Sequence, residues 1–179
     1  MMEHSNVRDL VYIAAFAALI AVCSWISIPA AVPFTMQTFA VFAALGLLGG
    51  KRGTFAVLIY LLLGAVGLPV FAGFKAGLGA LLGTTGGYLV GFVFAGLIYL
   101  AAEKIFGGRT AVKALAMLAG LAACYAFGTG WFMTVYAKAN GPVSLGTVLG
   151  WCVLPFVVPD LVKIGLALLL TGRLKRFVH

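Results

Sequence analysis

Long apolar runs, separated by short polar or glycine-rich breaks, make up almost all of the chain. The hydrocarbon core of a bilayer is about 30 Å thick, and a helix needs about 20 mainly apolar residues to cross it. The first run is too long for the apolar core of a signal peptide, which is about 7–15 residues. The pattern predicts an all-α integral membrane protein, with residues 1–179 as a single domain and six transmembrane helices over about 10–28, 34–50, 54–66, 86–106, 112–136 and 145–172.

The last of these runs contains two charged residues. In PFVVPDLVK, residues 155–163, Asp160 and Lys163 have otherwise apolar surroundings. A charge at membrane depth costs about 2.5–3.5 kcal/mol even on lenient scales, so it faces a protein interior or a wet cavity and is paired. Residues three apart share a helix face, so the two side chains can pair, and Pro155 and Pro159 are expected to bend the helix beside them. The pattern predicts a binding site; a packing ion pair beside a functionless kink is the alternative.

Two further stretches have features that suit a small ligand. Thr35, Gln37 and Thr38 form an uncharged polar cluster that can fix a ligand by hydrogen bonds or can cap a helix. Residues 67–87 are apolar and rich in glycine, without helical periodicity in their first half. Because unpaired backbone cannot face lipid, this segment must lie on the surface or fold into a protein-lined cavity, which makes it a candidate lid.

Small residues recur at intervals of four on two predicted helices. The pairs Ala14/Ala18 and Ala17/Ala21 occupy neighbouring faces of the first helix, and such pairs let another helix approach closely in lipid. They fit either a partner subunit or packing inside the bundle. Trp131, in YAFGTGWF, can stack on a ligand ring or anchor the chain at the membrane interface. A bare face near the fourth helix can take a helix or a flat ligand; its glycines are Gly79, Gly83, Gly87 and Gly91.

Composition and charge agree with a membrane protein. The chain is 64% hydrophobic and 9% charged, with a mean hydropathy of +1.16. The net charge of +8 does not indicate nucleic acid, because the basic residues lie singly or in pairs between apolar runs. With six spans, one side of the membrane would hold Arg8, Lys51, Arg52, Lys104, Arg109, Lys113, Arg173, Lys175 and Arg176, and the other Lys75 and Lys138.

This asymmetry predicts the topology, because cytoplasmic loops of membrane proteins are enriched in lysine and arginine. Both termini are expected to be cytoplasmic. The polar cluster near residue 35, the segment 67–87 and the turn at 138–144 are then all on the outer side. We expect them to meet Trp131 and the charged pair in one outward-facing pocket.

Several chemistries find no support in the sequence. The three cysteines, Cys23, Cys124 and Cys152, are isolated, which indicates neither a disulfide framework nor a metal site. One buried acid, one buried lysine and no interior histidine do not make an enzyme active site, so neither catalysis nor a cofactor is predicted. A stand-alone proton-coupled secondary transporter of a small molecule is the alternative to a binding subunit. We find no internal symmetry of the kind such transporters often have.

Five motifs, taken in order, resemble a known family. VPFTMQTF, GLPVFAG, GTTGGYLVGF, YAFGTGWF and PFxxPDxxK are similar to the bacterial BioY family, the biotin-binding S components of energy-coupling-factor (ECF) vitamin transporters. The resemblance implies a six-helix membrane fold that captures biotin from outside. It also implies a partner module made of a transmembrane coupling subunit and two cytoplasmic ATPases, which alone use ATP. In two places this chain differs: Thr84 replaces a common proline, and Phe74-Lys75 replaces small residues.

The resemblance also implies roles for individual residues. Ala14 and Ala18, with Ala17 and Ala21 beside them, would contact the coupling subunit. Biotin has two ureido N–H donors, a ureido carbonyl, a flat bicyclic ring and a carboxylate on an aliphatic chain. Asp160 can accept from the ureido N–H groups while Lys163 donates to the carbonyl, and Lys75 can attract the carboxylate unless it is simply solvated. The ligand contacts expected are Asp160, Lys163, Gln37, Thr35, Phe71, Gly73, Gly87, Tyr88, Trp131 and Lys75.

Overall fold

Helices account for most of the chain. The computed structural model describes residues 2–30 and 32–178, with the side chains of 2–6 and 175–178 outside that description, among them Lys175 and Arg176 of the charge count. The elements in order are α1 (Met2–Trp25), β1 (Ser27–Ile28), β2 (Phe34–Thr35), α2 (Gln37–Ala65), the 3-10 turn η1 (Ala72–Phe74), α3 (Leu78–Leu82), α4 (Gly86–Phe106), α5 (Thr110–Asn140), α6 (Leu145–Cys152) and α7 (Leu154–Val178).

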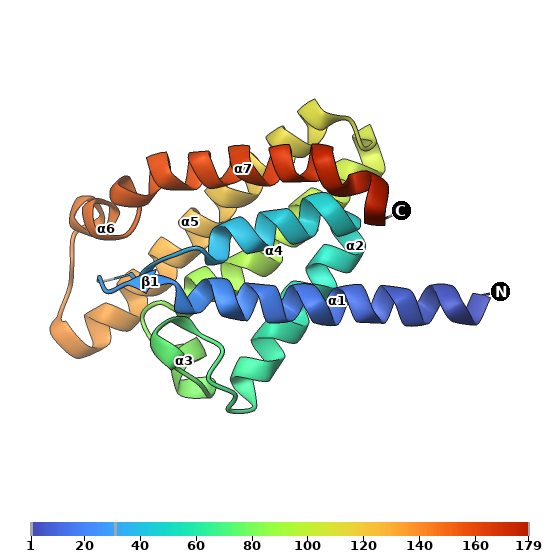
Figure 1. Cartoon of the computed structure of the whole chain (residues 1–179). Coiled ribbons are helices and arrows are strands. Elements are labelled where there is room, and N and C mark those ends of the chain that lie inside the picture. Colours follow the sequence, from blue (N-terminus) through green and yellow to red (C-terminus); the bar gives the residue numbers. More distant parts are fainter. Residues whose placement is uncertain (1, 31, 179) are drawn as a thin grey trace.

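The all-α prediction is confirmed, but the count of six separate spans is not. Within the described residues, five helices are long and apolar enough to cross a membrane: Val7–Trp25, Gln37–Ala65, Gly86–Phe106, Thr110–Asn140 and Leu154–Leu174. The predicted spans 34–50 and 54–66 both lie in α2, which is interrupted at Gly49 (φ 82°, ψ 167°). This left-handed φ suits glycine because it has no Cβ. Figure 1 shows the helix changing direction there, whereas residues 51–53, which separate the two predicted spans, are helical.

The first and last predicted spans also end differently from the prediction. α1 stops at Trp25, and Ser27–Ile28 then pair with Phe34–Thr35 as a short antiparallel hairpin. The run 145–172 is divided at Val153 (φ −125°, ψ −58°) into α6 and α7. Pro155 is the second residue of α7, where its missing backbone N–H costs no intrahelical hydrogen bond, so it suits the start of the new helix. Pro159 lies inside α7 and does not end it.

Glycine lets α4 and α5 pack closely along their length. A Cβ at Gly91 would lie 2.8 Å from Cys124 Sγ, and one at Gly120 would lie 3.0 Å from Ala95 Cβ. Such close approach of small residues stabilises helix pairs in lipid. The bare face predicted around the fourth helix is therefore covered by a neighbouring helix at Gly91.

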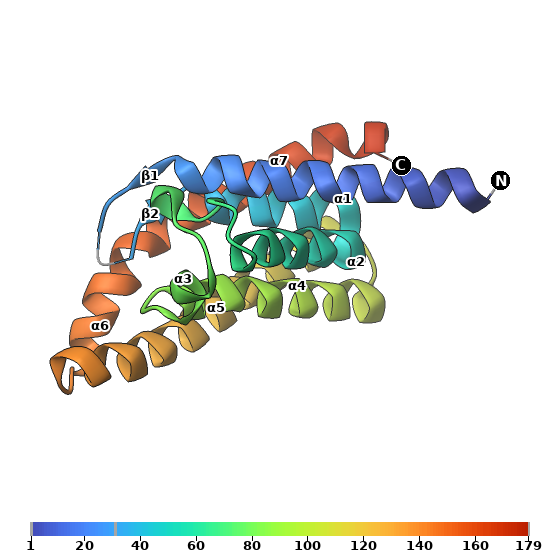
Figure 2. The ribbon, with the colours of Figure 1, turned by 90° about the horizontal axis from the view of Figure 1, so that it is seen from below.

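The two ends of the molecule differ in character. The start of α1, the end of α7 and the α4–α5 turn lie at one end, with β1, α6 and the α5–α6 turn at the other (Figures 1 and 2). At the first end, Arg52 Nε lies 3.1 Å from Asp9 Oδ2, and Glu103 Oε2 accepts a 2.6 Å hydrogen bond from the Gly50 N–H. Lys113 is buried there and donates to the Gly46 carbonyl oxygen at 3.2 Å. These contacts hold the interrupted α2 against α1, α4 and α5.

Candidate ligand-binding site

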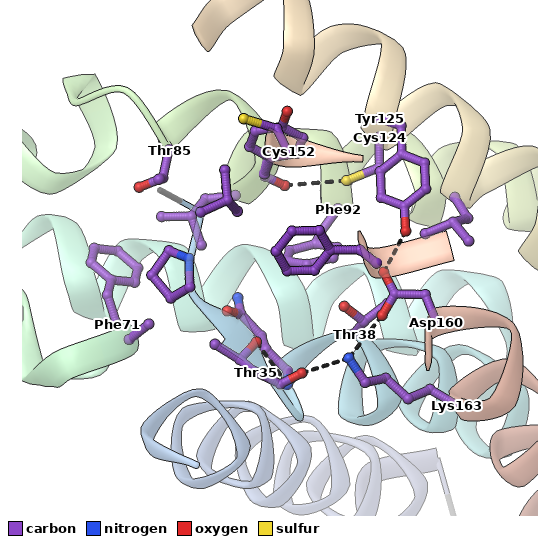
Figure 3. A pocket seen from close by; sticks show the side chains of 18 of the residues that line it. Thr35, Thr38, Phe71, Thr85, Phe92, Cys124, Tyr125, Cys152, Asp160 and Lys163 are labelled. Atoms are coloured by element: carbon purple, nitrogen blue, oxygen red, sulfur yellow. Dashed lines mark hydrogen bonds and ion pairs between the residues drawn. The ribbon is translucent and has the colours of Figure 1, made fainter. Parts of the chain in front are cut away.

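A pocket between the helices gathers residues from distant parts of the chain (Figure 3). Its lining comes from the β1–β2 region, the start of α2, the segment after α2, and helices α4 to α7. Seven of the predicted contacts line it together: Thr35, Gln37, Phe71, Lys75, Tyr88, Asp160 and Lys163. Most of the remaining lining is apolar or aromatic, which is the usual make-up of small-molecule sites.

Asp160 and Lys163 form a buried pair at one wall of the pocket. They are 3% and 4% exposed, and Lys163 Nζ lies 2.8 Å from Asp160 Oδ1. Lys163 also donates to the Thr35 carbonyl oxygen at 2.7 Å, and its ammonium lies 4.2 Å from the centre of the Phe34 ring. Tyr125 donates to Asp160 Oδ2 at 2.6 Å. Each carboxylate oxygen of Asp160 thus accepts one hydrogen bond and has a further lone pair. The ammonium of Lys163 has three N–H donors, and two of them are used by Asp160 and Thr35.

Gln37 has a buried amide in the same pocket. The residue is 4% exposed, and its Nε2 has no hydrogen-bond partner among the described residues. Leaving such a donor unpaired costs about 1–3 kcal/mol, so a ligand acceptor placed against it would be favoured. Thr35 lines the same pocket, and its Oγ1 accepts the backbone N–H of Gln37, the first residue of α2, at 3.2 Å.

Three predicted contacts are not part of this lining. A Cβ at Gly87 would collide with the Cβ of Trp131, so these two residues pack α4 against α5. Trp131 Nε1 donates to the Gly83 carbonyl oxygen at 2.9 Å, which ties the end of the glycine-rich segment to α5. Gly73 lies in η1 with φ 69° and is exposed. The structure therefore gives Trp131 and Gly87 a packing role and Gly73 a turn.

Other lining residues were not singled out from the sequence. Tyr125 begins the motif YAFGTGWF, but the sequence pattern favours Trp131, six residues later and on a different face of α5. Cys124 is beside it, and the α4 residue Phe92 has no polar atom to mark it. The residues of this group that Figure 3 labels are Thr85, Phe92, Cys124, Tyr125 and Cys152, whereas Thr38, which the figure also labels, belongs to the polar cluster predicted from the sequence. Aromatic residues at helical spacing are usually core residues, so only the fold could identify them.

The two alanine pairs of α1 lie on different faces. Ala17 is 1% exposed and Ala21 is 6% exposed, and both belong to the hydrophobic core. Ala14 and Ala18 are exposed. Only the pair Ala14/Ala18 leaves its small side chains accessible to another helix.

Comparison with known proteins gives a consistent answer along the full length. The model of the BioY family matches residues 1–179. The chain is 45% identical over 171 residues to the biotin transporter BioY of Thermotoga maritima, a match that covers 94% of this chain and 96% of that protein. It is 39% identical over 169 residues to the probable biotin transporter BioY of Pyrococcus horikoshii, with the same coverage of 94% and 96%.

A solved structure is similar in fold as well as in sequence. It is the crystal structure at 2.1 Å of the S-component for biotin from an ECF-type ABC transporter. The TM-score is 0.85 at 29% identity, over 98% of this chain and 95% of that one.

Proposed function

Since the chain belongs to the BioY family, we propose that it is the S component that captures biotin for an ATP-driven ECF transporter. The full-length similarity to biotin transporters supports this function, and so does the similarity to the biotin S-component of an ECF-type transporter. The chain is a transporter component and not an enzyme. It acts as a single membrane domain and needs no cofactor of its own.

The observation that carries the proposal is the buried set of polar groups at one wall of an otherwise apolar pocket. Asp160 has lone pairs to accept the ureido N–H groups, and Lys163 has an N–H left for the ureido carbonyl. The unpaired Gln37 amide supplies another donor. Hydrogen bonds to charged groups are about twice as strong as neutral ones, so this wall fits the polar edge of the ring. Phe71, Tyr88 and the other apolar lining residues fit its flat, sulfur-containing body.

The far end of biotin is an aliphatic chain with a carboxylate. With the ring held against Asp160 and Lys163, this chain points towards the residues contributed by the segment after α2. Lys75 is exposed there and also lines the pocket. We therefore assign to Lys75 the carboxylate at the mouth of the pocket.

The membrane orientation follows from the basic residues. Lys104 and Arg109 lie on either side of the α4–α5 turn, and Lys51 follows Gly50, whose backbone N–H donates to Glu103 of α4. That turn lies at the end of the molecule where α1 begins and α7 ends (Figure 1). Because basic residues are enriched on the cytoplasmic side, the pocket opens outward and both termini are cytoplasmic. The location is a bacterial cytoplasmic membrane.

The partner module is a transmembrane coupling subunit with two cytoplasmic ATPases. The exposed pair Ala14/Ala18 is the docking surface for the coupling subunit, because small side chains let a second helix approach the backbone of α1. Ala17 and Ala21 face the core and support α1 from behind.

Radiolabelled biotin tests the proposal in two stages. The purified chain should bind biotin in the absence of any partner. In membrane vesicles, uptake should require the coupling subunit and the ATPases. Uptake by the chain alone that a protonophore abolishes would favour a proton-coupled secondary transporter instead, and failure of the purified chain to bind biotin would contradict the proposal.

A further inference from the structure

The outer end of α1 holds a loop that covers the pocket. We call residues 67–77 the cover loop; it supplies Phe71, Ala72 and Lys75 to the pocket lining. Figure 2 shows its green ribbon beside the end of α1, and η1 packs against α1. A loop that forms part of the wall and part of the mouth controls how a ligand leaves.

Three contacts join the cover loop to α1. Ser24 Oγ donates to the Val70 carbonyl oxygen, and Trp25 Nε1 donates to the Pro69 carbonyl oxygen at 2.9 Å. The Trp25 ring also stacks on Phe74, with the ring centroids 5.3 Å apart and the planes at 26°. Trp25 thus contacts the loop on both sides of Phe71 and Ala72, and Lys75 directly follows the stacked Phe74.

Phe74 adopts a backbone conformation that needs support. Its φ is 57°, and it is the only residue other than glycine with a positive φ among those described. A bulky L-residue is disfavoured in this region, and its side chain is 64% exposed, so burial in a core does not hold it in place. Such strain persists where surrounding contacts fix the residue. The Phe71 N–H donates to the Lys75 carbonyl oxygen at 3.1 Å and closes the backbone around Phe74. The stacked Trp25 ring is the contact that holds the Phe74 side chain.

Phe71 and Gly77, on either side of Phe74 in the cover loop, have contacts that do not involve Trp25. Phe71 is 2% exposed, and its ring fills the space that a Cβ at Gly64 would occupy. It also meets Tyr60 edge-on, with centroids 5.6 Å apart, and the Gly77 N–H donates to the Gly64 carbonyl oxygen at 2.7 Å. Loss of the Trp25 contacts would therefore release residues 72–75 of the cover loop without unfolding the chain.

We propose that Trp25 and Phe74 form a clasp that keeps the cover loop closed over the bound ligand and sets the rate at which the ligand leaves. Neither residue lines the pocket, so both act as positioning residues through Ala72 and Lys75. As a statement about ligand release, the inference rests on the proposed function. As a statement about the loop, it can be tested without biotin.

The first experiment measures biotin dissociation from the purified chain. Trp25→Ala removes a ring stack and a hydrogen bond, so dissociation should become about five- to tenfold faster. Trp25→Phe keeps a ring and should be intermediate. Because the two residues act through one contact, Trp25→Ala combined with Phe74→Gly should be no faster than the faster single variant. Unchanged dissociation in Trp25→Ala, with wild-type binding intact, would overturn the clasp.

The control is Trp151→Ala. Trp151 is 42% exposed against 38% for Trp25, lies in α6 and meets Tyr136 edge-on at 6.0 Å, but is not part of this pocket lining. Its loss should leave biotin dissociation unchanged. An equal acceleration in Trp151→Ala would mean that loss of any outer tryptophan loosens the fold, and this too would contradict the clasp.

The second experiment measures amide hydrogen exchange in the ligand-free chain. Residues 72–75 should exchange faster in Trp25→Ala than in wild type, with α4 and α5 unchanged. Unaltered exchange of the cover loop would overturn the clasp whether or not the chain binds biotin. Failure of the wild-type chain to bind biotin would instead overturn the proposed function.

Discussion

Asp160 is a charged residue that is almost fully buried. Removing a carboxylate from water costs several kcal/mol, and its partners repay this only with good geometry. Here Lys163 and Tyr125 each contact one of its oxygens, at 2.8 and 2.6 Å. Both groups are thus hydrogen-bonded within the chain and still have capacity for a ligand.

Asp160→Asn tests whether this capacity is used. The substituted amide has one neutral oxygen acceptor, where the Asp160 carboxylate has two charged oxygens. Biotin affinity should therefore fall more than tenfold, because a hydrogen bond to a charged group is worth about 1.5–3 kcal/mol. Calorimetric titration of the purified variant would measure it. Gel filtration must show a folded chain, because Lys163 loses its partner. A folded variant with wild-type affinity would remove Asp160 from the site.

Lys75 should make a smaller contribution that depends on salt. An exposed ion pair is worth about 0.2–1 kcal/mol and is screened by salt. Lys75→Ala should therefore weaken biotin modestly at low ionic strength and leave its uncharged methyl ester unaffected, as measured by competition binding. Lys138→Ala, the other basic residue predicted on the outer side, is the matched control. Equal losses for both ligands, or none, would show that Lys75 is simply solvated.

Among the elements, α1 has a buried face, an exposed face and a contact with the cover loop at its end. Ala17 and Ala21 pack into the core, Ala14 and Ala18 face outward, and Trp25 ends the helix at the cover loop. A helix in lipid has no water-facing side to mark its exposed face, so only packing separates the two alanine pairs.

Bulky substitution on the exposed face should separate capture from transport. Ala14→Trp with Ala18→Trp should leave biotin binding intact and abolish co-purification with the coupling subunit, because the approach of two helices depends on small residues. Ala122 and Ala126 of α5 are exposed and also four apart, so Ala122→Trp with Ala126→Trp is the matched control. If only the α5 variant lost the partner, the docking surface would lie on α5.

For the whole molecule, the pocket and the chain ends lie at opposite ends. The hairpin β1–β2 and the cover loop cover one end, and the ion pair Asp9–Arg52 and the Glu103–Gly50 contact hold the other. In the orientation proposed above, this separation would place ligand entry and the proposed cytoplasmic ATPases on opposite sides of the membrane.

Cysteine labelling would test this orientation. With Cys23, Cys124 and Cys152 replaced by serine, a single cysteine at Gly141 should react with a membrane-impermeant maleimide in intact cells. A single cysteine at Gly108 should react only after the cells are opened. Both turns are exposed or half-buried in the structure. The reverse pattern would invert the topology and place the pocket on the cytoplasmic side.

Local features were enough for part of this picture. The apolar runs determine a membrane protein by length alone. The spacing of Asp160 and Lys163 puts them within reach of each other on one helix, and the structure contains that pair at 2.8 Å. The polar cluster at Thr35 and Gln37 was also apparent, because polar side chains are conspicuous among apolar ones.

Tertiary structure decided the remainder. Membrane helices are apolar all round, so their sequence does not reveal which face is buried. Only packing could bring Tyr125 into contact with Asp160, 35 positions away. Packing also puts Trp131 against Gly87 and not in the pocket lining. It buries Ala17 and leaves Ala14 exposed. The interruption of α2 at Gly49, away from the basic residues 51 and 52, depends likewise on the Glu103 carboxylate brought by α4. Contacts between helices need the assembled bundle, and no local pattern encodes them.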